Sequence, residues 1–201
     1  MDVTVLGPAL MALGTLVNET NRLVNNDNSK IAVKVNADFQ KGSFEIQLDV
    51  IRTLCDQFQS LFTSHVTVEQ LLIFLGLAAP VKDVLGLPSV IDIIKWAKKR
   101  KIDRATQNQD GTVTLFIKDE SMTVNATTVN IYQSVPVRES LDAMVAPTKH
   151  EGINTFEVRM GDDHSNPIQV VSKEESTSFE FSEADLTQNE ESSVQKYIQW
   201  V

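Results

Sequence analysis

The feature of this 201-residue chain that most constrains its fold is a pair of alternating segments on either side of a polar turn. Between residues 31 and 50, apolar side chains occupy every second position before and after Gln40–Ser43. A period of two places the apolar residues on one face of a β-strand and the polar residues on the other. The segment therefore predicts an antiparallel hairpin with one buried face and one face in water.

A second alternating pair, residues 113–117 and 122–126, flanks the turn Asp119–Ser121 and predicts another hairpin. Two shorter apolar runs, Phe156–Val158 and Ile168–Val171, predict further strands. Apolar residues that recur every three or four positions predict helices between the strands. The expected helices cover Pro8–Val24, residues 50–62, a segment opened by a Thr67–Gln70 capping box, one opened by Ser89, a short one capped by Thr127 or Thr128, and one opened by Pro136.

These elements predict an α+β fold. We expect two antiparallel β-hairpins, or one mixed sheet, with helices packed on one face and a helical insertion at about residues 51–104. Residues 1–172 would form this domain. Residues 173–201 hold seven acidic and two basic side chains, and we expect them to lead into a missing C-terminal part. Hydrophobic residues make up 42% of the chain and charged residues 22%, which excludes global disorder.

The apolar N-terminus favours a helix over a secretory signal. Asp2 is its only early charge, whereas a signal peptide begins with positive residues. No uninterrupted apolar run reaches about 18 residues, which argues against an ordinary membrane span. The single cysteine, Cys55, excludes a disulfide scaffold. We therefore predict a cytoplasmic protein, with association at a membrane surface still open.

Four stretches of the chain read PALMALGTLVNETNRLVN, KGSFEIQLDV, IIKWAKKRK and GINTFEVRM. In this order they resemble a scattered family of uncharacterised bacterial or prophage-associated proteins, over about residues 8–160. The resemblance implies an N-terminal α+β module with a helical insertion and a phage-linked or mobile-element setting. The family has no assigned activity, so the resemblance carries over no functional residue.

A basic segment between residues 95 and 104 is the main candidate site. It contains six cationic residues and one acidic residue, Asp103. Its net charge is therefore +5, in a chain whose net charge is −9. It could be a phosphate-binding patch, an anchor to an anionic membrane surface, or a helix C-terminus whose dipole favours cations. Trp96 could stack a base, insert at a lipid interface or belong to the core. The candidate contact residues are Lys95, Trp96, Lys98, Lys99, Arg100, Lys101 and Arg104.

The apolar segment before it, residues 71–96, has two halves of about 10 and 14 residues, each too short to span a bilayer of about 30 Å. Glycines and prolines, including Pro80 and Gly86, lie near its middle. Three interpretations remain open. The segment is a helical hairpin that inserts into a membrane, a buried helix pair, or an oligomer interface.

The sequence contains no recognisable catalytic motif, so we predict no catalytic residue and no cofactor. The histidines His65, His150 and His164 lack a second His or Cys at ligand spacing, and we predict no metal site. Asp162 and Asp163 beside His164 are more typical of a solvated turn. Cys55 lies near an apolar helix face and is interpreted as a small hydrophobe.

The leading hypothesis is a non-enzymatic interaction or assembly module that works as a homo-oligomer or within a larger protein. Its expected partner is a second copy or another protein. The first alternative is a membrane-active effector, of a toxin or phage-defence kind, that would use residues 71–96 and 95–104. The second is a local nucleic-acid binder that would use the same basic segment. A net charge of −14 outside that segment makes a broad nucleic-acid surface less favoured.

Overall fold

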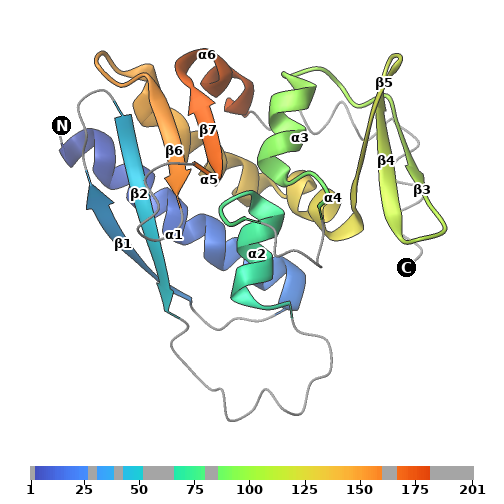
Figure 1. Cartoon of the computed structure of the whole chain (residues 1–201), viewed down its shortest axis with the longest axis horizontal. Coiled ribbons are helices and arrows are strands. Elements are labelled where there is room, and N and C mark those ends of the chain that lie inside the picture. Colours follow the sequence, from blue (N-terminus) through green and yellow to red (C-terminus); the bar gives the residue numbers. More distant parts are fainter. Residues whose placement is uncertain are drawn as a thin grey trace, which may run out of the picture.

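The computed structural model describes residues 3–26, 31–38, 43–51, 66–79, 86–159 and 167–181. Within them the chain is an α+β fold with two sheets (Figure 1). The strands are β1 (Ala32–Asp38), β2 (Ser43–Ile51), β3 (Arg104–Gln107), β4 (Thr112–Ile117), β5 (Glu120–Asn125), β6 (Thr155–Arg159) and β7 (Gln169–Ser172). The helices are α1 (Val3–Asn25), α2 (Val68–Leu75), α3 (Val90–Ala97), α4 (Ala126–Gln133), α5 (Val135–Val145) and α6 (Lys173–Ser176), with the 3-10 turns η2 (Ala146–Lys149) and η3 (Thr177–Phe179).

The larger sheet is mixed, with the strand order β1-β2-β6-β7. β1 and β2 are antiparallel, with Ala32 opposite Ile51, so the first predicted hairpin is confirmed. β6 runs parallel to β2, with Phe156 opposite Phe44, and β7 returns antiparallel to β6. Parallel neighbours need a crossover, and the chain between β2 and β6 supplies it with α2 to α5. α1 and α5 lie together on one face of this sheet (Figure 1).

α1 begins at Val3, five residues before the predicted start at Pro8, so that prediction of the helix start was wrong. Leu6 is buried and extends the apolar face of the helix one turn upstream, into the same core as Leu13 and Val17. This packing favours a helix that continues through Pro8, although a proline inside a helix removes one backbone hydrogen bond.

Two asparagines on α1 hold incoming segments by their backbones. The side-chain nitrogen of Asn18 donates to the carbonyl oxygen of Ile31 at 3.1 Å, and its oxygen accepts from the N–H of Ile31 at 2.8 Å. Asn25 makes the same two bonds with Val66, at 2.9 and 2.8 Å. α1 therefore fixes both the chain that enters β1 and the chain that approaches α2.

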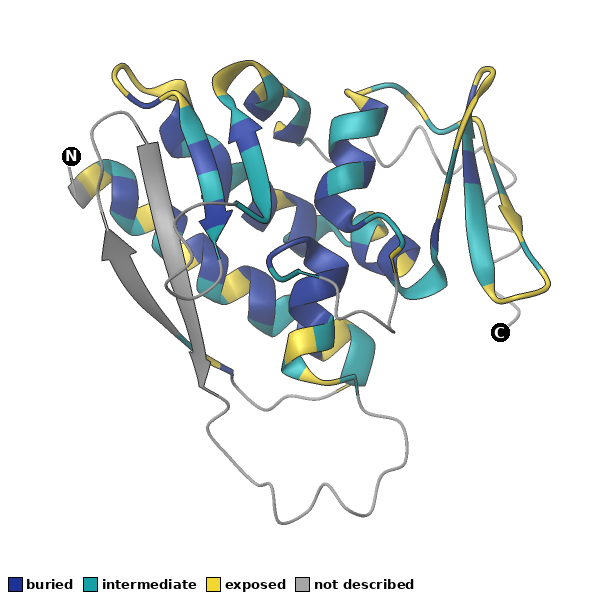
Figure 2. Ribbon diagram, viewed as in Figure 1, coloured by how far each residue is buried: buried dark blue, intermediate teal, exposed yellow. Residues whose placement is uncertain are grey.

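The apolar segment predicted as a helical insertion supplies two helices of the main core (Figure 2). The predicted Thr67–Gln70 capping box begins α2, and α3 begins at the predicted Ser89, which forms a second box with Asp92. Gly76 ends α2 in the left-handed region at φ 90°. The fully or nearly fully buried side chains are Leu71, Leu72, Ile73, Phe74 and Leu75 on α2, and Val90, Ile91, Ile93, Ile94 and Ala97 on α3.

The smaller sheet has the order β3-β4-β5 and contains the second predicted hairpin. β4 and β5 pair with Thr112 opposite Asn125, which confirms that hairpin. β3 was not predicted, because its four residues are mostly exposed and show no apolar alternation. A separate apolar cluster lies between this sheet and helices α3 and α4. Its buried members are Ile93, Leu115, Val124 and Val129.

The start of α4 differs from the prediction, whereas the start of α5 agrees with it. Asn125 caps α4, because its side-chain oxygen accepts from the N–H of Thr127 at 2.8 Å. The predicted cap at Thr127 or Thr128 was therefore wrong. β5 continues to Asn125, so the first helical N–H groups that need an acceptor are those just after it. Pro136 lies in the first turn of α5, as predicted.

Residues 173–181, which we call the strap, form the first part of the acidic segment and dock on the rest of the described chain. A capping box between Ser172 and Glu175 begins α6, and η3 follows. Phe179 is 0% exposed and belongs to the main core. The N–H of Phe181 donates to Asp142 of α5 at 3.4 Å. The strap is therefore held by both apolar and polar contacts.

Candidate interaction surface

The basic segment runs from α3 into the loop before β3. Lys95 lies in the last turn of α3, whereas Lys98 and Lys99 follow the helix with left-handed backbones at φ 49° and 61°. The Lys95 ammonium donates to the carbonyl oxygen of Val170 at 2.9 Å and lies 3.0 Å from the carboxylate of Glu175. Lys95 therefore ties α3 to β7 and to the strap.

Glu180 of the strap lies between two lysines. Its carboxylate is 2.5 Å from the Nζ of Lys99 and 3.2 Å from the Nζ of Lys149, which also lies 3.2 Å from Asp142. Hydrogen bonds from Lys99 and Lys149 hold the pKa of Glu180 below its usual value. Burial lowers the pKa of Lys149, but hydrogen bonds and charge attraction to Asp142 and Glu180 raise it overall.

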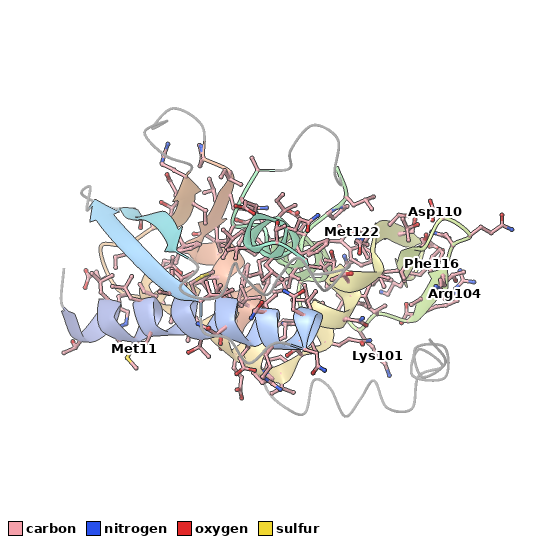
Figure 3. All side chains as sticks on the ribbon, turned by 90° about the horizontal axis from the view of Figure 1, so that it is seen from below. Met11, Lys101, Arg104, Asp110, Phe116 and Met122 are labelled. Carbon is pink, nitrogen blue, oxygen red and sulfur yellow. The ribbon has the colours of Figure 1, made fainter. Side chains whose placement is uncertain are left out.

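Arg100 and Arg104 each bind a residue of the smaller sheet. Both terminal nitrogens of Arg100 reach the carboxylate of Glu120, at 2.5 and 3.0 Å. This fork raises the pKa of Arg100 and lowers the pKa of Glu120. The guanidinium of Arg104 lies over the ring of Phe116, 4.0 Å from its centroid, and Figure 3 shows the two residues next to each other on the smaller sheet.

The other three candidate residues have different surroundings. Trp96 is half-buried and packs against the cluster under the smaller sheet, so the core interpretation of this side chain is the one that its position supports. Its carbonyl oxygen also accepts a hydrogen bond from Arg100 at 2.8 Å. Lys98 and Lys101 are exposed. The structure thus spreads the seven predicted residues over α3, the following loop and the first residue of β3.

At least three of the six cations in this segment bind carboxylates of the same chain. Two of those carboxylates belong to the strap, which lies about 80 residues away in the sequence. Such pairs depend on the tertiary fold, so a charge pattern read along the chain could not reveal them. The segment's contact with an external anion stays a prediction, and Lys95, Lys99 and Arg100 already have an acidic partner.

We expect Glu180→Gln to lower the melting temperature at pH 7 and to lower it by less as the pH falls below about 4.5. The lysines lower the folded-state pKa of Glu180 beneath its ordinary value of about 4.5. The stabilisation is therefore complete above that value and is lost as the pH falls through the folded-state pKa. Thermal unfolding between pH 7.5 and 3.5 measures it, with Glu139→Gln, an exposed carboxylate of α5, as the control. A melting-temperature difference that stays constant with pH would contradict this assignment.

The apolar segment at residues 71–96 is covered by protein wherever its helices are described. Leu71 and Leu75 are 0% exposed, as are Val90 and Ile93. Burial of the helix pair is one of the three interpretations that the sequence left open, and these side chains support it. Among the described residues, no helix combines the length and the apolar character needed to cross a membrane.

α1 carries a surface that the sequence analysis did not single out. Met11 is 76% exposed and Leu23 is 43% exposed, and these are the two large exposed hydrophobic side chains among the described residues. Figure 3 shows Met11 projecting from α1 away from the described body of the protein. Residues 3–18 contain no charged side chain. Thr4, Pro8, Met11 and Thr15 follow one another along the exposed face.

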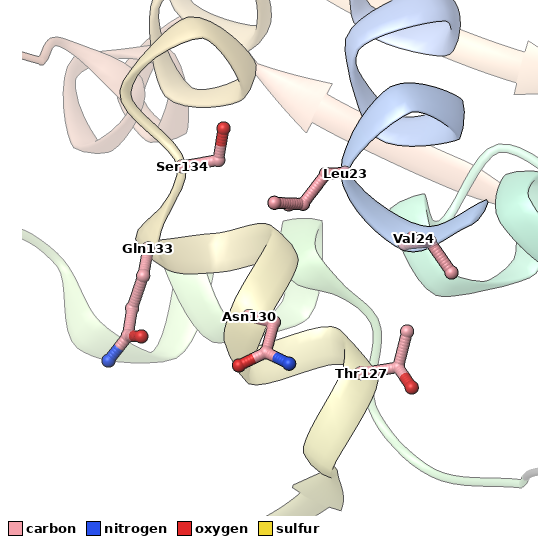
Figure 4. A pocket seen from close by; sticks show the side chains of 6 residues that line it. All are labelled: Leu23, Val24, Thr127, Asn130, Gln133 and Ser134. Carbon is pink, nitrogen blue, oxygen red and sulfur yellow. The ribbon is translucent and has the colours of Figure 1, made fainter. Parts of the chain in front are cut away.

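A hollow of about 410 Å³ lies between the last turn of α1 and α4 (Figure 4). Leu23 and Val24 supply its apolar wall. The opposite wall carries hydroxyl and amide groups that can donate and accept hydrogen bonds, from Thr127, Asn130, Gln133 and Ser134. No titratable side chain lines this hollow, so its lining offers surface contacts rather than acid–base chemistry.

No metal centre is apparent in the part of the chain that the structure describes, because no three His, Cys, Asp or Glu side chains gather there. His150 is exposed, next to η2. Cys55, His65 and the Asp162–His164 turn lie outside the described residues. A search of protein-family models, curated proteins and solved structures finds no match to this chain.

Proposed function

We propose that this chain is a non-enzymatic assembly module that pairs with a second copy of itself through the exposed face of α1. The observation that carries the proposal is the exposure of Met11, at 76%, in the middle of an uncharged helix face. A large apolar side chain in water gains free energy when a partner covers it.

The absence of charge on this face favours a second copy over another partner. In a two-fold interface the same surface meets itself, so a surface that carries mostly one sign of charge repels its own copy. The chain as a whole has a net charge of −9, yet residues 3–18 carry none. Self-pairing through this face therefore avoids the repulsion that most of the acidic surface would cause.

An antiparallel pair of α1 helices fits this face. With a two-fold axis near Met11, the two methionines meet at the centre, and Gly7 faces Thr15 of the second copy. A Cβ added at Gly7 or Gly14 would meet no atom within 4 Å, so the surface is open at both positions. Small residues on either side of a long one allow two helices to approach closely.

The length of α1 suits such an interface. A helix of 23 residues is about 35 Å long, which is enough for several turns of contact on each copy. Stable interfaces bury more than about 1,000 Å² in total.

The two alternatives have less support from the described residues. A membrane-inserting hairpin would require Leu71, Leu75 and their neighbours to leave the main core. A phosphate-binding surface would have to compete with the acidic groups that Lys95, Lys99 and Arg100 already contact. We therefore rank both alternatives below self-pairing through α1.

Met11→Glu is expected to convert a dimer into a monomer, because it places two like charges opposite each other at the centre of the interface. Sedimentation velocity from 1 to 100 μM measures the change. We expect the dissociation constant to rise at least tenfold. Gln109→Glu, in the exposed loop between β3 and β4, adds the same charge elsewhere and should leave the dimer intact.

A wild-type chain that stays monomeric at 100 μM would overturn the proposal. So would a dimer that Met11→Glu leaves unchanged, because the interface would then lie on another surface. Circular dichroism of each variant checks that the fold persists. Glutamate is a good helix former and Met11 is exposed, so we expect no loss of helix.

A further inference from the structure

Arg138 of α5 is a buried cation without a carboxylate partner among the described residues. The residue is only 9% exposed, and its Nε is fully covered with no hydrogen-bond acceptor. The guanidinium carbon lies over two aromatic rings, 4.5 Å from the centroid of Tyr132 and 5.1 Å from that of Phe181. The first ring belongs to α4 and the second to the strap.

Several other arginines of the described chain have the acidic partner that Arg138 lacks there. Arg22, Arg100 and Arg159 each contact a glutamate. The acid nearest to Arg138 in helical spacing is Asp142, one turn later on the same helix. Asp142 is already engaged, because its two oxygens accept from Lys149 and from the N–H of Phe181.

An unpaired charge at this depth is costly. Removing a guanidinium from water loses its hydration, and the lost hydration is restored only by hydrogen bonds or an opposite charge. Stacking on aromatic rings returns part of this free energy, but it leaves the in-plane N–H donors unused. Contact with two rings restricts the position of the group, and its unused donors match a planar or tetrahedral oxyanion.

We propose that Arg138 is the centre of a binding site for a small oxyanion, a carboxylate or a phosphate. The ligand would be held end-on by the two terminal nitrogens, because Nε is covered. The position of the residue adds to the attraction. Arg138 lies in the first turns of α5, where the helix dipole favours negative charge, and Ser134 at the N-cap makes no side-chain hydrogen bond there.

This site is separate from the proposed dimer face, since none of its residues belongs to α1. An anion bound at Arg138 would link the strap to α5, because Phe181 of the strap forms one wall of the site. The inference does not depend on self-association, and a monomeric chain would bind the anion equally well.

Thermal unfolding of the full chain tests the site. The chain is titrated with sodium phosphate or sodium acetate, with sodium chloride added to keep the ionic strength constant. We expect the melting temperature of the wild type to rise with one of these anions, in proportion to the logarithm of its concentration above the dissociation constant, and by about 5–10 °C at a hundred times that constant. The anion that is effective tells phosphate and carboxylate ligands apart.

Arg138→Met should abolish the anion-dependent rise and leave the melting temperature in chloride unchanged or higher, because it removes an unpaired charge. Arg138→Lys keeps the charge without the fork and should weaken binding at least tenfold. Arg22→Met is the control, since Arg22 of α1 is exposed, pairs with Glu19 and lies outside the basic segment. Equal shifts in the wild type and in Arg138→Met, or no shift with either anion, would overturn the proposal.

Discussion

Gly76→Ala is expected to destabilise the fold by about 2–4 kcal/mol, one of the two largest effects that we predict. Gly76 ends α2 at φ 90°, a conformation that costs any residue with a Cβ about 1 kcal/mol. The new methyl group would also lie 2.5 Å from the Oγ of Ser89 and 3.1 Å from its Cβ. Both distances are shorter than a van der Waals contact, so one of the two groups must move.

Ser89 cannot move freely, because it caps α3. Its hydroxyl accepts from the N–H of Asp92 at 3.3 Å and lies 2.7 Å from the Asp92 carboxylate, which in turn accepts from Gln169 of β7. Turning the side chain away would give up the cap, at a cost of about 1 kcal/mol. The end of α2 and the start of α3 are thus built around a position where only glycine fits.

Two variants separate the backbone effect from the steric effect. Gly111→Ala, at φ 80° with no atom within 4 Å of the added Cβ, should cost only about 1 kcal/mol. Ser89→Gly in the Gly76→Ala background should recover part of the loss, and a double-mutant cycle from urea unfolding measures the coupling. Equal costs for Gly76→Ala and Gly111→Ala would show that the contact with Ser89 contributes nothing.

Local patterns were sufficient for the parts of the fold that depend on near neighbours. The hairpin β4–β5, the Thr67–Gln70 box and the start of α3 at Ser89 all rest on side chains within a few residues of one another. Turn chemistry, capping and alternation act over this range. They could therefore be predicted without knowledge of the tertiary structure.

The environment of the basic segment could not be predicted in this way. Lys99 and Glu180 are separated by 81 positions, and Lys95 and Val170 by 75. No local rule connects them. Hydropathy alone also does not distinguish a buried helix pair from one that inserts into lipid, because both environments select the same side chains. The exposure of Met11 likewise depends on which face of α1 the larger sheet and α5 leave uncovered.

Phe179→Ala is expected to lower the free energy of unfolding by about 3–5 kcal/mol, the cost of removing a large aromatic side chain from a packed core. Phe179 is fully buried, although it lies in a segment whose composition is that of a solvated acidic tail. Its ring anchors the strap, and the ion pairs of Glu175 and Glu180 lie on either side of it. Loss of the ring should therefore also weaken the two ion pairs.

Hydrogen exchange distinguishes an anchored strap from a tail. In the wild type, the amides of residues 173–181 should exchange slowly, as part of the main cooperative unit. In Phe179→Ala they should exchange faster than those of α5, because the strap opens before the core does. Leu23→Ala, at a side chain that is 43% exposed, should cost less than about 1 kcal/mol and leave the strap protected. A Phe179→Ala variant as stable as the wild type would mean that the strap lies outside the core.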